Sequence, residues 1–300
     1  MGLLAALARR GYDFVTPTPS TCRRMAEQPA PERPSLRDVF GWSRPFAEGE
    51  LDREVLELLD STDRLENLGG TYRSRVRVSV VHGRLFLHSA FPANTADAVF
   101  LGPDSYRFAD LVAAELTHRP TPKTILDIGA GAGVGGVVAA KYAPGAKVTL
   151  TDVNPAALTL AAANAEYAGV HAELVRGYGL EAAPRDLDLI IANPPYIAGA
   201  SGRTYKDGGD LHGAQLSLDW ARQGMTRLKS GGRMVLYTGS AILAGGVDQL
   251  RSLLASAMVG GEFTLSYREL DPDIFSGELR RSAYSDVERI AAVGAVITRS

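Results

Sequence analysis

Asp188-Leu189-Ile190-Ile191-Ala192-Asn193-Pro194-Pro195-Tyr196 is the most informative segment of the sequence. The apolar run from Leu189 to Ala192 is typical of a strand that is buried on both faces of a parallel sheet. Two prolines end this run, because a proline nitrogen carries no hydrogen and each proline biases the preceding residue toward an extended conformation. We therefore expect a stiff polar corner at the carboxyl end of a buried strand.

The expected corner combines two hydrogen-bond acceptors with a flat ring. Asn193 contributes a side-chain amide oxygen, Pro194 a backbone carbonyl and Tyr196 an aromatic face. This combination suits a planar NH2 group. The alternative is structural, since prolines end many strands and Tyr196 would then only pack beneath a loop.

Strands and helices alternate on both sides of this segment. The pattern predicts helices over 134–142, 155–168, 214–228 and 247–257. It predicts seven strands, over 125–128, 147–151, 173–175, 187–192, 234–238, 263–267 and 290–298. The expected fold class is α/β, with a seven-stranded, doubly wound, Rossmann-like sheet in which the terminal hairpin supplies one antiparallel strand.

Glycines follow the first of these strands directly, in Asp127-Ile128-Gly129-Ala130-Gly131-Ala132-Gly133. Gly129, Gly131 and Gly133 let the backbone approach a ligand closely, and the next helix N-terminus exposes amide donors. Asp127 places a carboxylate at the pocket mouth, where it would repel a pyrophosphate and attract an ammonium group. The segment predicts a nucleotide pocket for a cofactor that carries an amino acid.

Asp152 ends the second strand, about 20 residues beyond the glycines, where an acidic side chain can accept hydrogen bonds from both ribose hydroxyls. The alternative is that Asp152 or Asn154 caps the helix that begins near Pro155. The spacing from Gly131 favours the ribose role.

The first hundred residues follow another pattern, with short helices over 3–10, 36–40 and 50–59 and an irregular stretch over 16–34. Residues 75–80 alternate between apolar and polar, and 85–87 return after a turn at His82-Gly83. Helices followed by a basic hairpin resemble a winged-helix arrangement. We expect residues 1–100 to form a smaller substrate-recognition domain, ahead of a larger domain over 101–300.

The hairpin arginines have two interpretations. As a wing, the hairpin would bring Arg73, Arg75, Arg77 and Arg84 to a nucleic-acid backbone. Alternatively, these arginines lie on the solvent face of a half-buried hairpin, which is the ordinary arrangement.

The composition indicates a globular chain without a strong overall electrostatic field. Of its 300 residues 45% are hydrophobic, and the net charge is −2, so bulk charge favours no polyanionic partner. Cys22 is the only cysteine, which excludes internal disulfides and indicates a reducing compartment. The histidines lack metal-ligand spacing, so we expect no metal. Without an export signal or a membrane-length apolar run, we expect a cytoplasmic protein with no membrane partner and leave its oligomeric state open.

Taken together, the motifs resemble a class I S-adenosylmethionine-dependent methyltransferase. Asp-x-Gly-x-Gly-x-Gly, the acidic residue after the second strand and Asn-Pro-Pro-Tyr occur in the family's order, over roughly residues 125–298. The resemblance implies a catalytic corner of Asn193, Pro194 and Tyr196, which holds an acceptor NH2 in line with the sulfonium methyl. It also implies S-adenosylmethionine as the cofactor, with contacts from Asp127, Gly129, Gly131, Gly133, Asp152 and Asn193.

Asn-Pro-Pro-Tyr resembles the motif of enzymes that methylate adenine or guanine amines in nucleic acids, or the glutamine amide of peptide-chain release factors. Pro103-Asp104-Ser105 and residues 208–213 resemble segments of the glutamine enzymes, although Gly102 and Tyr106 depart from their pattern and the basic hairpin has no counterpart there. We expect a protein or peptide glutamine amide as the acceptor. A nucleic-acid amine and a small molecule are the alternatives, and a non-catalytic binding module is the alternative outside enzymes. His212 is either a proton acceptor or lid residue, or a solvated loop histidine.

Overall fold

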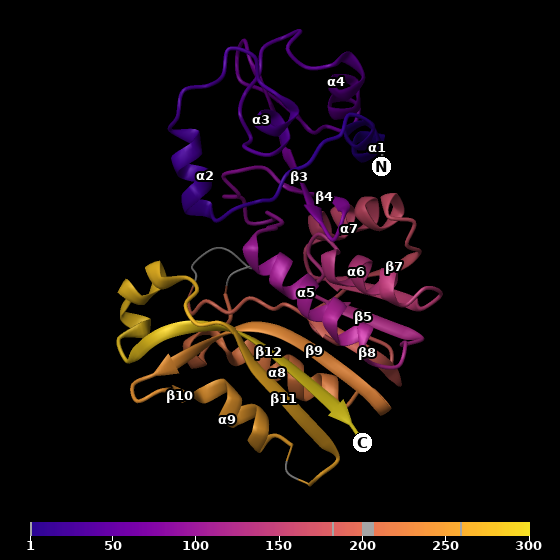
Figure 1. Ribbon diagram of the computed structural model, residues 1–300, viewed down its shortest axis with the longest axis vertical. Coiled ribbons are helices and arrows are strands. Elements are labelled where there is room, and N and C mark those ends of the chain that lie inside the picture. Colours follow the sequence, from indigo (N-terminus) through magenta and orange to yellow (C-terminus); the bar gives the residue numbers. More distant parts are fainter. Residues whose placement is uncertain (1, 182, 200–206, 259) are drawn as a thin grey trace.

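The computed structural model describes residues 2–181, 183–199, 207–258 and 260–300. A large α/β part, from magenta to yellow in Figure 1, lies below a smaller N-terminal part drawn in indigo and purple. Within the described ranges, every helix is too short or too polar to span a bilayer.

The central sheet of the large part has the order β11-β12-β9-β8-β5-β6-β7, and the two-residue β10 (Val247–Asp248) pairs with β9. Its strands are β5 (Thr124–Ile128), β6 (Lys147–Asp152), β7 (Ala172–Arg176), β8 (Leu187–Ala192), β9 (Leu228–Leu243), β11 (Phe263–Asp271) and β12 (Val287–Arg299). Neighbours from β7 to β9 pair in parallel, whereas β12 is antiparallel to both β9 and β11. The seven expected strands are confirmed, including a single antiparallel one within this path.

Helices cover both faces of the sheet, which confirms the doubly wound α/β class. The helices of this part are α5 (Pro103–Thr117), α6 (Val134–Tyr142), α7 (Pro155–Tyr167), α8 (Gln215–Met225) and α9 (Gln249–Ser256). Leu189 and Ile191 of β8 join the core beneath α5 and α6, whereas Ile190 and Ala192 join the core beneath α8 and α9. The apolar run of β8 is thus buried on both sides, as expected of a parallel strand.

The N-terminal part contains four short helices and two antiparallel ribbons. These are α1 (Gly2–Arg9), α2 (Pro19–Ala26), α3 (Leu36–Phe40), α4 (Arg53–Asp60), the ribbon of β1 (Leu65–Asn67) with β2 (Tyr72–Ser74), and the ribbon of β3 (Val76–Val81) with β4 (Arg84–Ser89). The irregular stretch expected over 16–34 is wrong, because α2 lies within it. Pro19 occupies the first turn, where no amide hydrogen is needed, and the Thr18 side chain accepts the Thr21 amide.

The β3–β4 hairpin is confirmed, but it is not an exposed wing. The Leu87 amide donates to Asn164 Oδ1 of α7 at 2.8 Å, and the Asn164 side chain donates back to Leu87 O at 3.0 Å. Apolar residues of the hairpin share one core with α5, α6 and α7. That core continues across residue 100, and the division into two domains at that point stays a prediction.

The hairpin arginines do not form a free basic face. Arg77 is 4% exposed, which contradicts both the wing and the solvent-face interpretation for this residue. Arg73 pairs with Glu66 at 2.7 Å, and Arg84 donates to the Ala168 carbonyl at 2.9 Å. Arg75 remains exposed. The alternation identified two faces of β3, but the polar face meets an interior cavity instead of water.

Candidate active site

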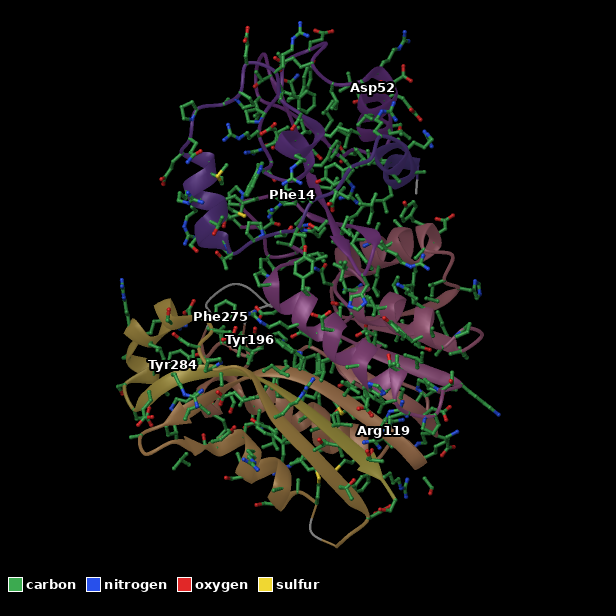
Figure 2. The ribbon with its side chains drawn as sticks, in the orientation of Figure 1. Phe14, Asp52, Arg119, Tyr196, Phe275 and Tyr284 are labelled. Carbon is green, nitrogen blue, oxygen red and sulfur yellow. The ribbon has the colours of Figure 1, made fainter. Side chains whose placement is uncertain are left out.

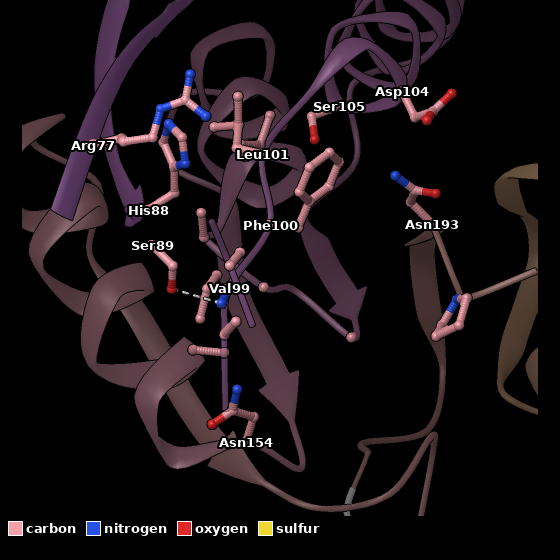
Figure 3. Close-up of a pocket in the computed structure, with 18 of the residues that line it drawn as sticks. Arg77, His88, Ser89, Val99, Phe100, Leu101, Asp104, Ser105, Asn154 and Asn193 are labelled. Atoms are coloured by element: carbon pink, nitrogen blue, oxygen red, sulfur yellow. Dashed lines mark hydrogen bonds between the residues drawn. The ribbon is translucent and has the colours of Figure 1, made fainter. Parts of the chain in front are cut away.

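A cavity of about 890 Å³ lies between the N-terminal part and the carboxyl ends of β5, β6 and β8. Its wall includes all of the cofactor and catalytic residues expected from the sequence except Gly133, whose neighbours Ala132 and Val134 line it. Figure 3 shows Asn193 at the right of this space, Arg77 and His88 at its upper left and Asn154 at its lower left. The volume is near the upper end of the range of about 300–1,000 Å³ for small-molecule sites.

The glycine loop folds as its sequence requires. Gly129, Gly131 and Gly133 have φ of 63°, 55° and 77°, a left-handed conformation that other residues rarely adopt. An added Cβ on Gly131 would meet nothing nearer than 4.0 Å, so the loop leaves space above this residue. Gly133 precedes α6 directly, which places that helix N-terminus next to the cavity.

Asp127 lies beneath this loop and is 1% exposed. Its Oδ2 accepts the Gly136 amide at 2.7 Å. Burial raises the pKa of this carboxyl to about 7, against the opposing effect of the Gly136 hydrogen bond, and the nearby Asp152 raises it further. The carboxylate therefore lies deeper than the expected pocket mouth, and near neutral pH it is poised between its charged and neutral forms.

Asp152 organises the loop instead of capping a helix. Its Oδ2 accepts the Gly131 amide at 2.9 Å, and its Oδ1 accepts the Asn154 amide at 2.9 Å. Asn154 is the N-cap of α7, since its Oδ1 accepts the Ala156 amide at 2.9 Å. Burial raises the pKa of Asp152, and the two hydrogen bonds oppose that rise. The cap alternative for Asp152 is thus excluded, and its contact with ribose stays a prediction.

The Asn193-Pro194-Pro195-Tyr196 corner leaves β8 as expected and lines the cavity. Asn193 is half-buried, and Figure 3 shows its amide pointing toward Asp104 and Ser105. Tyr196 is 8% exposed, because its ring lies on Gly239 and packs edge-on against Phe275 with centroids 5.8 Å apart (Figure 2). Contact of its ring with an acceptor stays a prediction.

A polar cluster that the sequence did not predict supports this corner. Asp104 Oδ1 accepts the Tyr237 hydroxyl at 2.6 Å and lies 3.5 Å from Arg107 Nη1. Burial, and then the Asp104 carboxylate, raise the pKa of Tyr196 well above its usual range. A neutral Tyr196 hydroxyl can donate a hydrogen bond but is a poor general base. The Pro103-Asp104-Ser105 motif was the only sequence signal for this cluster.

The wall near Asp152 offers apolar surface for a base. Val153 and Tyr178 line the cavity with exposed fractions of 38% and 54%, and Trp220 packs beneath Gly129. An acidic residue for ribose, an apolar wall for adenine and a buried carboxyl for an ammonium group fit S-adenosylmethionine. Sequence reasoning missed these three side chains, and only the position of Val153 directly after Asp152 could have indicated one of them.

His212 lies outside this cavity. Its Nε2 is 3.0 Å from Asp286 Oδ1, and its ring stacks obliquely near Tyr284. The adjacent Gly213 packs on the Tyr196 backbone, but the His212 side chain pairs with Asp286, just before β12, and does not line the cavity, which argues against a role as proton acceptor. Residues 200–206, between the corner and the Gly208–Gly213 segment, lie outside the described residues.

Comparison with known proteins identifies the fold. Residues 107–239 match the profile of the "Methyltransferase small domain" family. This segment is a methyltransferase domain. The match confirms the resemblance to methyltransferases, and the Rossmann-like fold class agrees with a solved structure of the same fold. A solved structure of M. jannaschii TYW2 in complex with AdoMet superposes with a TM-score of 0.51 at 13% identity, over 79% of this chain and 93% of that one.

Curated relatives divide between two acceptor classes. A release factor glutamine methyltransferase of Bordetella pertussis is 37% identical over 39% of this chain and 43% of its own length. A ribosomal RNA small subunit methyltransferase C of Ectopseudomonas mendocina is 35% identical over 29% of this chain and 30% of its own. The chain thus spans about half or less of the curated relatives it matches, and the similarity does not choose between their acceptors.

Proposed function

We propose that this protein is an S-adenosylmethionine-dependent N-methyltransferase that acts on a planar NH2 group, namely a protein or peptide glutamine amide. The observation that carries this proposal is the Asn193-Pro194-Pro195-Tyr196 corner, which opens into the same cavity as the glycine loop and Asp152. A methyl donor held on the loop and an acceptor held at the corner would therefore share one water-restricted space.

In the proposed mechanism, the chain's own residues position the acceptor. The Asn193 amide oxygen and the Pro194 carbonyl accept the two N–H groups, which turns the nitrogen lone pair toward the methyl group. The cofactor, when bound, supplies an electrophilic methyl on a sulfonium. No side chain has to remove a proton first, because the amide nitrogen becomes acidic once it is methylated. Asp104 and Tyr237 keep the Tyr196 side chain of this corner in place.

The choice of a protein amide is supported by the hairpin. A nucleic-acid enzyme needs exposed cations that follow the phosphates. Here Arg77 is buried, Arg73 is paired with Glu66 and Arg84 is bonded to a backbone carbonyl. The similarity to ribosomal RNA methyltransferases keeps a nucleic-acid amine as the second candidate. A cytoplasmic location accompanies both candidates as a prediction.

The test uses methyl-labelled S-adenosylmethionine with the purified protein and a cell extract. Label that resists nuclease and is lost to protease supports a protein acceptor, and amino-acid analysis should then yield methylglutamine. Label that resists protease and is lost to nuclease would move the assignment to nucleic acid. Absence of cofactor binding at millimolar concentration, by calorimetry, would leave only a non-catalytic binding module.

A further inference from the structure

Arg77 is a buried charge that the proposed methyl transfer does not use. Its side chain lines the cavity, and the residue is 4% exposed. Its Nε donates to the Gly41 carbonyl at 2.8 Å and its Nη2 to Cys22 Sγ at 3.6 Å. Across the described part of the chain, no ion pair joins this guanidinium to a carboxylate.

A guanidinium that is buried without a counter-charge costs stability, so such groups are rare unless a ligand pairs with them. The other buried arginine of the cavity wall, Arg44, lies 3.8 Å from Asp38. The partly exposed Arg73 of the same wall is paired with Glu66. Arg77 is therefore the buried cation on this wall that is left for a ligand.

The polar side chains next to Arg77 bond one another and bring no second charge. His88 is its cross-strand partner on β4, which puts both side chains on one face, as Figure 3 shows. His88 Nε2 lies 2.9 Å from Ser79 Oγ, which in turn lies 2.5 Å from Thr16 Oγ1. Burial, and then the charge of Arg77, hold the pKa of His88 well below its usual range, so the imidazole is neutral at physiological pH.

We propose that this end of the cavity is an acceptor subsite that binds the carboxylate of an acidic peptide, with Arg77 as its counter-charge. The inference rests on the proposed function, because the same peptide would present its glutamine amide to Asn193 and Pro194. The N–H groups of Arg77 that do not bond Gly41 and Cys22 would hold one carboxylate by short, charge-assisted hydrogen bonds.

A carboxylate fits this subsite better than a polyphosphate chain. The cavity wall is mostly apolar, and its apolar residues include Trp42, Phe91, Pro92, Val99, Phe100 and Leu101. One buried cation balances one carboxylate, and the apolar wall accommodates the peptide's other side chains. A nucleic acid would bring successive phosphates and would need further unpaired cations.

The experiment uses a set of blocked pentapeptides that each contain one glutamine and one glutamate, with every possible spacing between the two. Each peptide is compared with a counterpart in which a glutamine replaces the glutamate. Binding to the full chain, saturated with S-adenosylhomocysteine, is followed by tryptophan fluorescence, because both tryptophans, Trp42 and Trp220, line the cavity. We expect the best glutamate peptide to bind at least about tenfold more tightly than its glutamine counterpart. Arg77→Met should abolish this preference, and Arg77→Lys, which keeps the charge, should retain part of it.

Arg75→Met is the matched control, because Arg75 precedes the same strand but is 51% exposed and lies outside the cavity wall. It should keep the preference of the parent protein. If Arg77→Met fails to fold, the parent, Arg77→Lys and Arg75→Met still decide the matter. Equal or absent binding of both peptides, with normal S-adenosylhomocysteine affinity, would overturn the subsite and leave the methyltransferase proposal intact. The subsite would also be overturned if a 5′-phosphorylated trinucleotide bound more tightly than the glutamate peptides and this preference depended on Arg77. If the parent protein bound no cofactor at all, the proposed function itself would be overturned.

Discussion

The buried Asp127 carboxyl predicts that cofactor binding depends on pH. Its pKa is raised to about 7, chiefly by burial, whereas an aspartate in the unfolded chain has a value near 3.8. The ammonium and sulfonium groups of S-adenosylmethionine favour the charged carboxylate and should lower this pKa in the complex. Binding should therefore release a proton wherever the free protein still holds one.

The magnitude follows from the value of about 7. At pH 6 about nine-tenths of the free protein would carry the proton, so binding should release about 0.9 proton and be about tenfold weaker than at full ionisation. Affinity should increase from pH 6 toward pH 7.5 and then level off. Calorimetry in two buffers with different ionisation enthalpies measures the proton release directly.

Asp127→Asn is the control for this prediction. It keeps an oxygen for the Gly136 amide and removes the titrating proton, so its affinity should be lower and nearly independent of pH in this range. The α-amino group of the cofactor titrates identically in both experiments. Affinity that stays flat between pH 6 and 7.5 in the parent, or an equal proton release in Asp127→Asn, would refute the reasoning.

Three further substitutions test the site. Asp152→Ala should weaken S-adenosylmethionine binding by about 1.5–3 kcal/mol in calorimetry, because it removes a charged acceptor that also orders Gly131. The control is the cap variant Asn154→Ala, which should lower the free energy of unfolding by about 1 kcal/mol. A larger loss of cofactor affinity in Asn154→Ala than in Asp152→Ala would contradict the role of Asp152. Asn193→Ala should lower kcat about 100-fold with a much smaller change in cofactor affinity, and equal turnover in variant and parent would return the corner to a structural role. Gly133→Ala should lower the free energy of unfolding by about 1–3 kcal/mol in denaturant titrations, since φ is 77° and the new Cβ would lie 3.2 Å from Ala161; unchanged stability would show that the loop relaxes.

Local patterns predicted the sheet because each strand carries its own signal. The apolar runs of β5 and β8 end in glycines or prolines, and these interruptions placed both loops at one edge of the sheet. The spacing from Gly131 favoured a ribose role for Asp152, but it could not show which residue caps α7, since either Asp152 or Asn154 could reach the first amides of that helix. The structure decided it through the competing bond to Gly131, which joins residues 21 positions apart.

The N-terminal part was harder to predict because its polar residues face inward. Period-two alternation shows that Arg77 and Ser79 share a face, but it carries no information on whether that face meets water or an interior cavity. The cavity wall is built from residues far apart in the chain, such as Arg77, Phe100 and Asn193. Their meeting depends on how the hairpin packs on α7, which no local pattern records.

The two ends of the cavity carry opposite charge, and this asymmetry connects the cofactor site with the acceptor proposal. Asp127 and Asp152 lie at the glycine loop, whereas Arg77, which has no carboxylate partner among the described residues, lies at the N-terminal end. A cationic cofactor is attracted to the first end and repelled from the second, and an anionic peptide experiences the reverse. Because burial strengthens such interactions, each ligand would be directed to its own end of one continuous space. The acceptor amide would then meet the sulfonium methyl where the two ends join, at the Asn193–Pro194 corner.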